Sequence, residues 1–177
     1  MPQLMGYISR VQPRLQSVAI QDVTVVDNTL VNSVWGFRFL SEDSTSIVVN
    51  NNRIRDMKED GIQLKDTASS SISGNSIRSC GNDAINLFDS SNVTIKDNTL
   101  ANNDWGIYSN DVISVVVSNN TISNVSLTGI DLTNAASSSI IGNSIQICGD
   151  DAIYLGSSSD VTVVDNTLVN GVWGHQL

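Results

Sequence analysis

A nearly identical segment of fourteen residues occurs close to both ends of the chain. Residues 161–174 read VTVVDNTLVNGVWG and differ from residues 23–36 only in carrying Gly171 where the earlier copy carries Ser33. Between the two copies, an asparagine followed two positions later by an aliphatic residue recurs every 22 to 24 residues. The members of this series are Asn28, Asn52, Asn75, Asn98, Asn120, Asn143 and Asn166. Such a period indicates a repeat protein, whose units pack against their neighbours.

Within each repeat the hydrophobic residues alternate with polar ones over three to five residues, as in Val93-Thr94-Ile95. Alternation of this kind is typical of β-strands, and Gly, Asn, Asp and Ser separate about three such segments in every repeat. Segments this short bury their apolar sides only when the repeats stack. The sequence therefore predicts a β-solenoid of about seven coils, stacked about 4.8 Å apart.

The recurrent asparagine suggests a second regularity. Asparagine is a turn residue that tolerates left-handed backbone geometry, so a turn on the surface would explain its presence. An inward amide could instead bond the equivalent asparagine one coil away. Because no repeat substitutes Asp or Gly at this position, we expect a stacked asparagine ladder.

Taken together, these features resemble the right-handed parallel β-helix proteins, which include pectate lyases, polygalacturonases, alginate epimerases and phage tailspikes. The resemblance covers residues 15–177 and implies an all-β, single-stranded right-handed parallel β-helix of the pectate-lyase-like superfamily. It also implies polysaccharide as a partner. Members are commonly exported, so an extracellular or cell-surface location is expected.

The ends of the chain depart from the repeat. Residues 1–14 break the pattern and are expected to form an N-terminal cap or a disordered segment, with the β-helix domain beginning at Leu15. The sequence stops within a repeat, which leaves two interpretations open. Residues 15–177 are a fragment of a longer solenoid, or an uncapped end is covered by another copy in a homo-oligomer.

The amino-acid composition excludes several classes of binding partner. Nine Lys and Arg against 18 Asp and Glu give a net charge of −9, which argues against nucleic acid, and no apolar run is long enough for membrane insertion. Cys80 and Cys148 are three coils apart, about 14 Å, too far for a disulfide or a shared metal. No cofactor is expected, although Ca²⁺ could bind between carboxylates and backbone carbonyls.

The outward face of the strand that follows the small residue of each repeat, together with the residue just before that small residue, is the most promising place for a groove. Rings stack on sugar faces, and amides or carboxylates bond hydroxyl groups, so a row that combines them fits a saccharide. The alternative is an ordinary solvated face. The candidate ligand-binding residues are Gln63, Asn86, Trp105, Tyr108, Asp131 and Tyr154.

Carboxylates on neighbouring coils could perform acid–base chemistry. Asp60 and Asp83 form one candidate catalytic pair, and Asp150 with Asp151 forms another. The alternative is that these residues cap backbone N–H groups in turns. Gly149-Asp150-Asp151-Ala152-Ile153 resembles the Gly-Asp-Asp-Cys-Ile motif of polygalacturonases, and Gly174-His175 falls near their Gly-His-Gly. Their Asn-Thr-Asp motif is replaced by Leu127-Thr128-Gly129, and their later Arg-Ile-Lys motif would lie beyond residue 177.

Three functions remain open on these observations. The first is a carbohydrate-binding solenoid without complete catalytic machinery, which the missing motif partners favour. The second is a polysaccharide-degrading hydrolase or lyase of the pectin type. The third is a structural scaffold that associates through its ends.

Overall fold

The computed structural model describes residues 19–176, with the side chains described as far as residue 170. The segment 1–14 and the expected start of the β-helix at Leu15 lie outside these residues. The described chain contains strands and turns but no helix, so it contains no helix that could span a membrane.

Short strands form three walls around one axis. The first wall is a seven-stranded parallel sheet of β1 (Thr24–Val26), β5 (Val48–Asn50), β9 (Ser71–Ser73), β12 (Thr94–Lys96), β15 (Val116–Ser118), β18 (Ser139–Ile141) and β20 (Thr162–Val164). Every strand pairs with the equivalent strand of the next coil. Six turns of the solenoid therefore separate the first of these strands from the seventh, as the sequence period predicted.

The other two walls join into one twelve-stranded sheet because β19 (Ser144–Gly156) continues through the corner between them. The second wall consists of β2 (Thr29–Val31), β6 (Arg53–Arg55), β10 (Ser76–Arg78), β13 (Thr99–Ala101), β16 (Thr121–Val125) and the beginnings of β19 and β21 (Thr167–Gln176). The third wall consists of β3 (Phe37–Phe39), β7 (Ile62–Lys65), β11 (Asp83–Phe88), β14 (Trp105–Asn110), β17 (Ile130–Thr133) and the ends of β19 and β21. A corner pair, β4 (Ser44–Thr45) and β8 (Thr67–Ala68), completes the strands.

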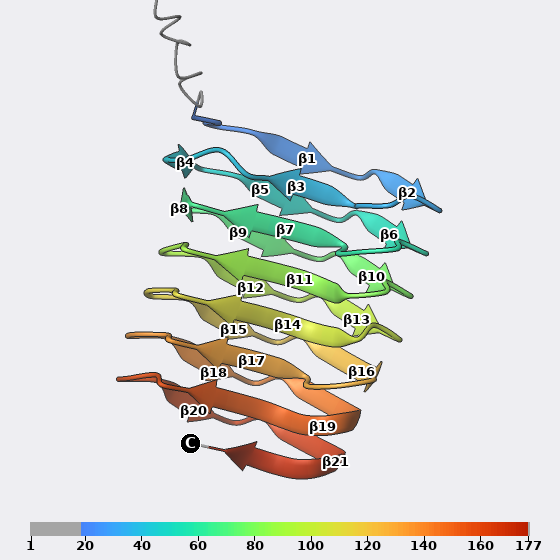
Figure 1. Ribbon diagram of the computed structural model, residues 1–177, viewed down its shortest axis with the longest axis vertical. Coiled ribbons are helices and arrows are strands. Elements are labelled where there is room, and N and C mark those ends of the chain that lie inside the picture. Colours follow the sequence, from blue (N-terminus) through green and yellow to red (C-terminus); the bar gives the residue numbers. More distant parts are fainter. Residues whose placement is uncertain (1–18, 177) are drawn as a thin grey trace, which may run out of the picture.

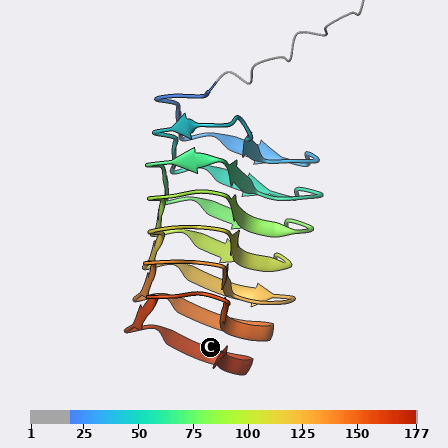
Figure 2. The same cartoon turned by 60° about the vertical axis from the view of Figure 1, so that its left-hand side comes forward.

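The solenoid is right-handed. As the chain descends in Figure 1, the nearer strands of the third wall run to the left and the first-wall strands behind them run to the right. The view in Figure 2 shows the coils stacked above one another along the whole length. The fold is thus the β-solenoid that the repeat predicted, with the right-handed parallel β-helix topology that the family resemblance implied.

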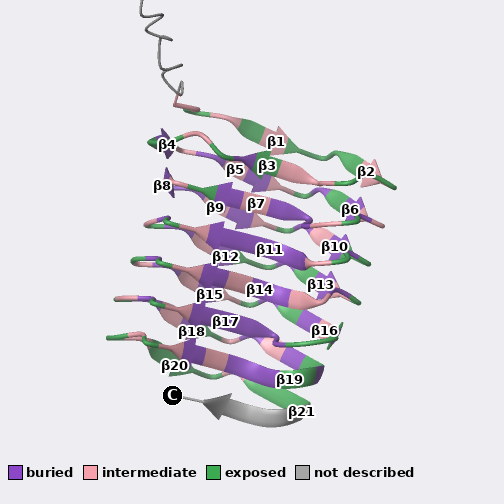
Figure 3. Ribbon diagram, in the orientation of Figure 1, coloured by how far each residue is buried: buried purple, intermediate pink, exposed green. Residues whose placement is uncertain are grey.

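Inward side chains from all three walls fill the interior. Alternation along each strand points every second side chain inward, and stacking turns these into continuous apolar columns. Burial is deepest in the central coils (Figure 3). The columns are formed by Val49, Ile72, Ile95, Val117 and Ile140 on the first wall, Ile54, Ile77, Leu100, Ile122 and Ile145 on the second, and Ile62, Ile85, Ile107, Ile130 and Ile153 on the third.

The asparagine ladder is present and continuous. From Asn28 to Asn143, each ladder residue donates its backbone N–H and its Nδ2 to the Oδ1 of the next, as Asn75 does to Asn98 at 2.9 and 3.0 Å. The same Nδ2 also donates to carbonyls, such as that of Val49 at 2.9 Å. Such bonds satisfy the polar groups of a corner that the strand ladders leave unpaired, which is why an amide can occupy an apolar interior.

The residues with left-handed backbone conformation are not the ladder asparagines themselves. The residue before each ladder asparagine has a positive φ, for example Asp97 (57°) and Asn119 (54°), whereas the ladder residues do not. Turn propensity therefore belongs to the preceding position, and the ladder position is selected by hydrogen bonding. Ile147 (φ 55°) is exceptional, because a β-branched side chain is poorly tolerated in this conformation.

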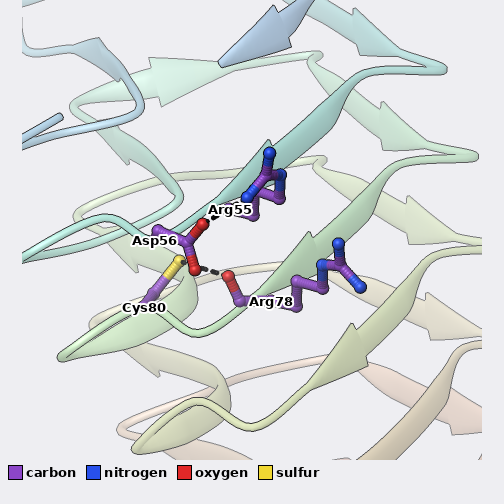
Figure 4. A network of polar contacts seen from close by, with 4 residues as sticks. All are labelled: Arg55, Asp56, Arg78 and Cys80. Carbon is purple, nitrogen blue, oxygen red and sulfur yellow. Dashed lines mark hydrogen bonds and ion pairs between the residues drawn. The ribbon is translucent and has the colours of Figure 1, made fainter. Parts of the chain in front are cut away.

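Both cysteines are free and buried at the corner between the second and third walls. The Sγ of Cys80 is 4.0 Å from the carbonyl oxygen of Arg78, beside the ion pair of Arg55 and Asp56 at 2.6 Å (Figure 4). Burial raises the pKa of Cys80 to about 12 and that of Cys148 to about 11. Both thiols are therefore protonated at neutral pH and belong to the core.

Candidate functional site

The outward side chains of the third wall stand in columns because its strands pair in register. One column runs from Gln63 through Asn86, Tyr108 and Asp131 to Tyr154. At the corner before this wall, the residue that precedes the inward isoleucine of each coil has to be small. A Cβ on Gly106 would lie 2.3 Å from a backbone oxygen of the next coil, so glycine allows the corner to turn tightly beside this wall.

A pocket of about 290 Å³ opens on this face between β11 and β14. It brings together three of the residues predicted to bind a ligand, one predicted to be catalytic, and two that were not predicted. They are Asn86, Trp105 and Tyr108, then Asp83, then Asn82 and Phe88. The size is at the lower end of pockets for small ligands, about 300–1,000 Å³.

Aromatic rings form one side of the pocket. The ring of Tyr108 meets that of Phe88 edge-on at 5.7 Å between centroids, and that of Trp105 edge-on at 5.4 Å. Edge-to-face contacts of this kind hold the three rings at fixed angles to one another. The rings are therefore arranged as a preformed aromatic surface.

The polar side of the pocket is buried. Asp83 and Asn86 are 3% and 4% exposed, and the Nδ2 of Asn86 donates to Oδ2 of Asp83. Because a carboxylate only accepts, this bond orients the amide and leaves Oδ1 of Asn86 facing away from Asp83. No described residue donates to that Oδ1, although the atom is buried. A buried acceptor without a partner is costly, and a bound donor would satisfy it.

A second carboxylate supports the first. Oδ1 of Asp60 accepts from Nδ2 of Asn82 at 2.7 Å and from the backbone N–H of Asp83 at 3.2 Å. Burial raises the pKa of Asp83 to about 7, and the negative charges of Asp60, Asp104 and Asp131 add to that rise. The structure thus brings together the predicted pair Asp60 and Asp83, with Asp83 facing the pocket.

The remaining predicted residues lie outside the pocket. Gln63 accepts at 2.9 Å from Nε of Arg38, whose guanidinium stacks 3.8 Å above the ring of Trp35. Burial raises the pKa of Asp131 to about 6, while a 2.7 Å hydrogen bond from the Thr133 hydroxyl opposes that rise. Tyr154 extends over Gly156 two coils away from Tyr108.

The second predicted carboxylate pair is divided between two environments. Asp150 is exposed, whereas Asp151 is 6% exposed and its Oδ1 has no hydrogen-bond partner among the described residues. Burial, followed by the charge of Asp150, raises the pKa of Asp151. Neither residue lines the aromatic pocket.

Phe88 and Asn82 were missed, but the sequence contains a signal for one of them. Phe88 comes two residues after Asn86 on the same strand, so alternation places it on the same outward face. Asn82 reaches the pocket through its bond to Asp60, which no spacing indicates.

A larger hollow of about 440 Å³ lies at the corner near β4 and β8. Apart from Ala68, its lining consists of polar and acidic residues, among them Asp43, Asp66 and Asp89, and contains no aromatic ring. No group of three or more His, Cys, Asp or Glu side chains in the described part of the chain is placed to hold a metal ion. The aromatic pocket is therefore the better candidate.

The family model described as periplasmic copper-binding protein (NosD) matches residues 15–173. The chain belongs to the NosD family. No curated protein matches this NosD-family chain.

Solved structures share the fold of this NosD-family protein. The A-module of the mannuronan C-5 epimerase AlgE4 of Azotobacter vinelandii is 14% identical with a TM-score of 0.72, over 91% of this chain and 56% of that one. The Streptococcus pneumoniae surface adhesin PfbA is 15% identical with a TM-score of 0.69, over 89% of this chain and 48% of that one. The enzymatically active domain of bacteriophage CBA120 tailspike protein 2 is 14% identical with a TM-score of 0.65, over 77% of this chain and 22% of that one. The NosD-family chain thus spans between about a fifth and just over half of these proteins, and the likeness is one of fold.

Proposed function

We propose that the third-wall pocket binds a saccharide. The observation that supports this most strongly is the combination of three rings in edge-on contact with a buried amide oxygen and a buried carboxyl group in one pocket of about 290 Å³. An aromatic surface accepts the apolar face of a pyranose, and the buried acceptors accept hydrogen bonds from its polar groups. Proteins of the same fold include a mannuronan epimerase and a surface adhesin, which agrees with this proposal.

The location that fits this role is outside the cytoplasm. The family is described as periplasmic, and solved structures of the same fold include a periplasmic alginate epimerase and a surface adhesin. We therefore propose that the chain meets its saccharide in the periplasm or at the cell surface.

Copper binding, which the family description names, is not part of the proposal. Copper favours thiolate, thioether and imidazole ligands, brought together in one coordination sphere. The two described thiols are buried and protonated in separate coils, and among the side chains described, residues 19–170, no group of three or more His, Cys, Asp or Glu is placed to hold a metal ion. The described donor set does not fit a copper site.

Catalysis is a second candidate because of Asp83. A carboxyl group whose pKa is raised to about 7 in a pocket can act as a general acid or base near neutral pH. In a pectin-type hydrolase this residue would donate a proton to the leaving oxygen, with Asp60 as its neighbour. Release of reducing ends by the protein, and its loss in Asp83→Asn, would favour this function over binding alone.

The experiment is a polysaccharide array of neutral, acidic and amino-sugar polymers, read for binding and for new reducing ends, with and without Ca²⁺. Trp105→Leu removes a ring from the pocket, and Trp35→Leu is the matched control because that ring lies against Arg38 instead. We expect the first variant to lose binding by about tenfold or more and the second to retain it. Equal affinities for the two variants would exclude the pocket as the binding site.

A further inference from the structure

The buried polar side of the pocket contains hydrogen-bond acceptors for a ligand. One N–H of Asn86 Nδ2 is donated to Asp83, and one N–H of Asn82 Nδ2 is donated to Asp60. The acceptors are Oδ1 of Asn86, which no described group partners, and the carboxyl oxygens of Asp83. A ligand group that satisfies these atoms must donate hydrogen bonds.

Charge favours a particular kind of donor. Asp60, Asp104 and Asp131 surround Asp83 closely enough that each disfavours its ionised form, and no basic side chain lines the cavity among the described residues. Lys65 stands beside Phe88 in the strand register, but its side chain is exposed and outside the lining. A carboxylate brought into this field would be repelled, whereas a cation would relieve the repulsion.

The aromatic side supports the same conclusion. Phe88, Trp105 and Tyr108 line one pocket and contact one another edge-on, next to the carboxyl group of Asp83. Ring faces attract a desolvated cation, and several rings around one cavity form the type of cage that binds ammonium groups. A carboxylate at the base of such a cage adds a charge-assisted hydrogen bond.

We propose that the pocket selects an amino sugar, whose ammonium group lies against Asp83 and Asn86 Oδ1 while its ring stacks on Trp105 and Tyr108. This inference rests on the saccharide-binding function proposed above and specifies its ligand class. Polymers of uronic acids are disfavoured by the same carboxylates.

The test compares three oligosaccharides by calorimetry near neutral pH. A β-1,4-linked glucosamine tetramer carries ammonium groups, the N-acetylglucosamine tetramer has the same backbone without the charge, and a galacturonate tetramer is anionic. We expect the glucosamine tetramer to bind at least about tenfold more tightly than the acetylated one, and the galacturonate tetramer to bind most weakly.

Two variants that each replace a carboxyl group by an amide identify the group responsible. Asp83→Asn keeps the shape of the pocket and should reduce the preference for glucosamine by about tenfold. Asp97→Asn is the control, because Asp97 is an exposed turn residue between the first and second walls where other coils carry asparagine, and it should leave binding unchanged.

The outcomes separate the two proposals. Equal or tighter binding of the acetylated or anionic tetramer, or an unchanged glucosamine preference in Asp83→Asn, would overturn the amino-sugar inference and leave saccharide binding in place. If no tetramer bound and the polysaccharide array also gave no signal, saccharide binding itself would be wrong. Tighter binding of glucosamine that depends on Asp83 supports both.

Discussion

Removing one amide from the middle of the asparagine ladder should be among the most destabilising single changes in the solenoid. Asn98 is fully buried, and its Oδ1 accepts from the backbone N–H and Nδ2 of Asn75. Its own Nδ2 donates to the carbonyl of Ile72 at 3.0 Å and to Oδ1 of Asn120 at 2.9 Å. Asn98→Ala therefore removes four hydrogen bonds from a dry interior.

The magnitude follows from what each group loses. In Asn98→Ala, the Nδ2 of Asn75 keeps its two carbonyl partners. The backbone N–H of Asn75 loses its acceptor, the Oδ1 of Asn98, at a cost of about 1–3 kcal/mol. The two bonds that Nδ2 of Asn98 makes contribute about 0.5–1.5 kcal/mol each. The free energy of unfolding should fall by about 2–6 kcal/mol, before any contribution from the cavity that remains.

The matched control is the same substitution at the first ladder position. Asn28 is exposed, and its Nδ2 donates to Val26 and Asn52 at a surface that water reaches. Asn28→Ala should cost less than about 1 kcal/mol. Urea unfolding followed by circular dichroism, at one pH for both variants, measures the difference. If Asn98→Ala and Asn28→Ala lay within about 1 kcal/mol of each other, the ladder would not be a source of stability.

Three further changes test other parts of the account. Ile147→Asn should stabilise the protein by about 1–2 kcal/mol, because asparagine tolerates the left-handed conformation at this exposed position, whereas Ile141→Asn, with no positive φ, should not. Gly106→Ala should cost about 1–3 kcal/mol by placing a methyl 2.3 Å from a backbone oxygen, and Gly156→Ala should cost less because its close neighbour is a side chain. Because burial raises the pKa of Asp83 from 3.8 to about 7, its contribution to stability is greatest below pH 4 and is lost as the pH rises through 7. Asp83→Asn should remove this dependence and stabilise the protein at pH 8 by up to about 4 kcal/mol.

Thermal or urea unfolding of the purified variants measures these changes in stability and can contradict each prediction. A destabilised Ile147→Asn would show that its side chain packs in a way that outweighs backbone strain. Equal costs for the two glycine substitutions would mean that the corner can relax. An unchanged pH dependence in Asp83→Asn would place the titrating group elsewhere, for instance at Asp131.

The fold could be predicted from the sequence because its signals repeat. A single Asn-x-aliphatic segment is weak, but seven of them at nearly constant spacing leave a stacked solenoid as the simplest solution. The ladder followed from the absence of substitutes at one position. The positions with left-handed geometry were not predicted, since Asn, Asp and Ser occur both in the ladder region and in the turn before it, and only hydrogen bonding distinguishes them.

The site could be predicted only in part for a related reason. Register places Asn86, Tyr108 and Tyr154 in one column, but it does not indicate toward which neighbour a ring leans. Tyr108 contacts Phe88 and Trp105 and forms the pocket with them, while Tyr154 lies over Gly156. Side-chain direction within a column depends on local packing, which the repeat does not encode.

The fluorescence of Trp105 tests the central claim most directly. Trp35→Phe combined with Trp173→Phe leaves Trp105 as the one tryptophan in the chain. Titration of this protein with the glucosamine and N-acetylglucosamine tetramers should change the Trp105 emission saturably, with the Kd that calorimetry gives and with glucosamine binding more tightly. Calorimetric binding without any change in Trp105 emission would show that the saccharide binds away from the pocket and would contradict the account.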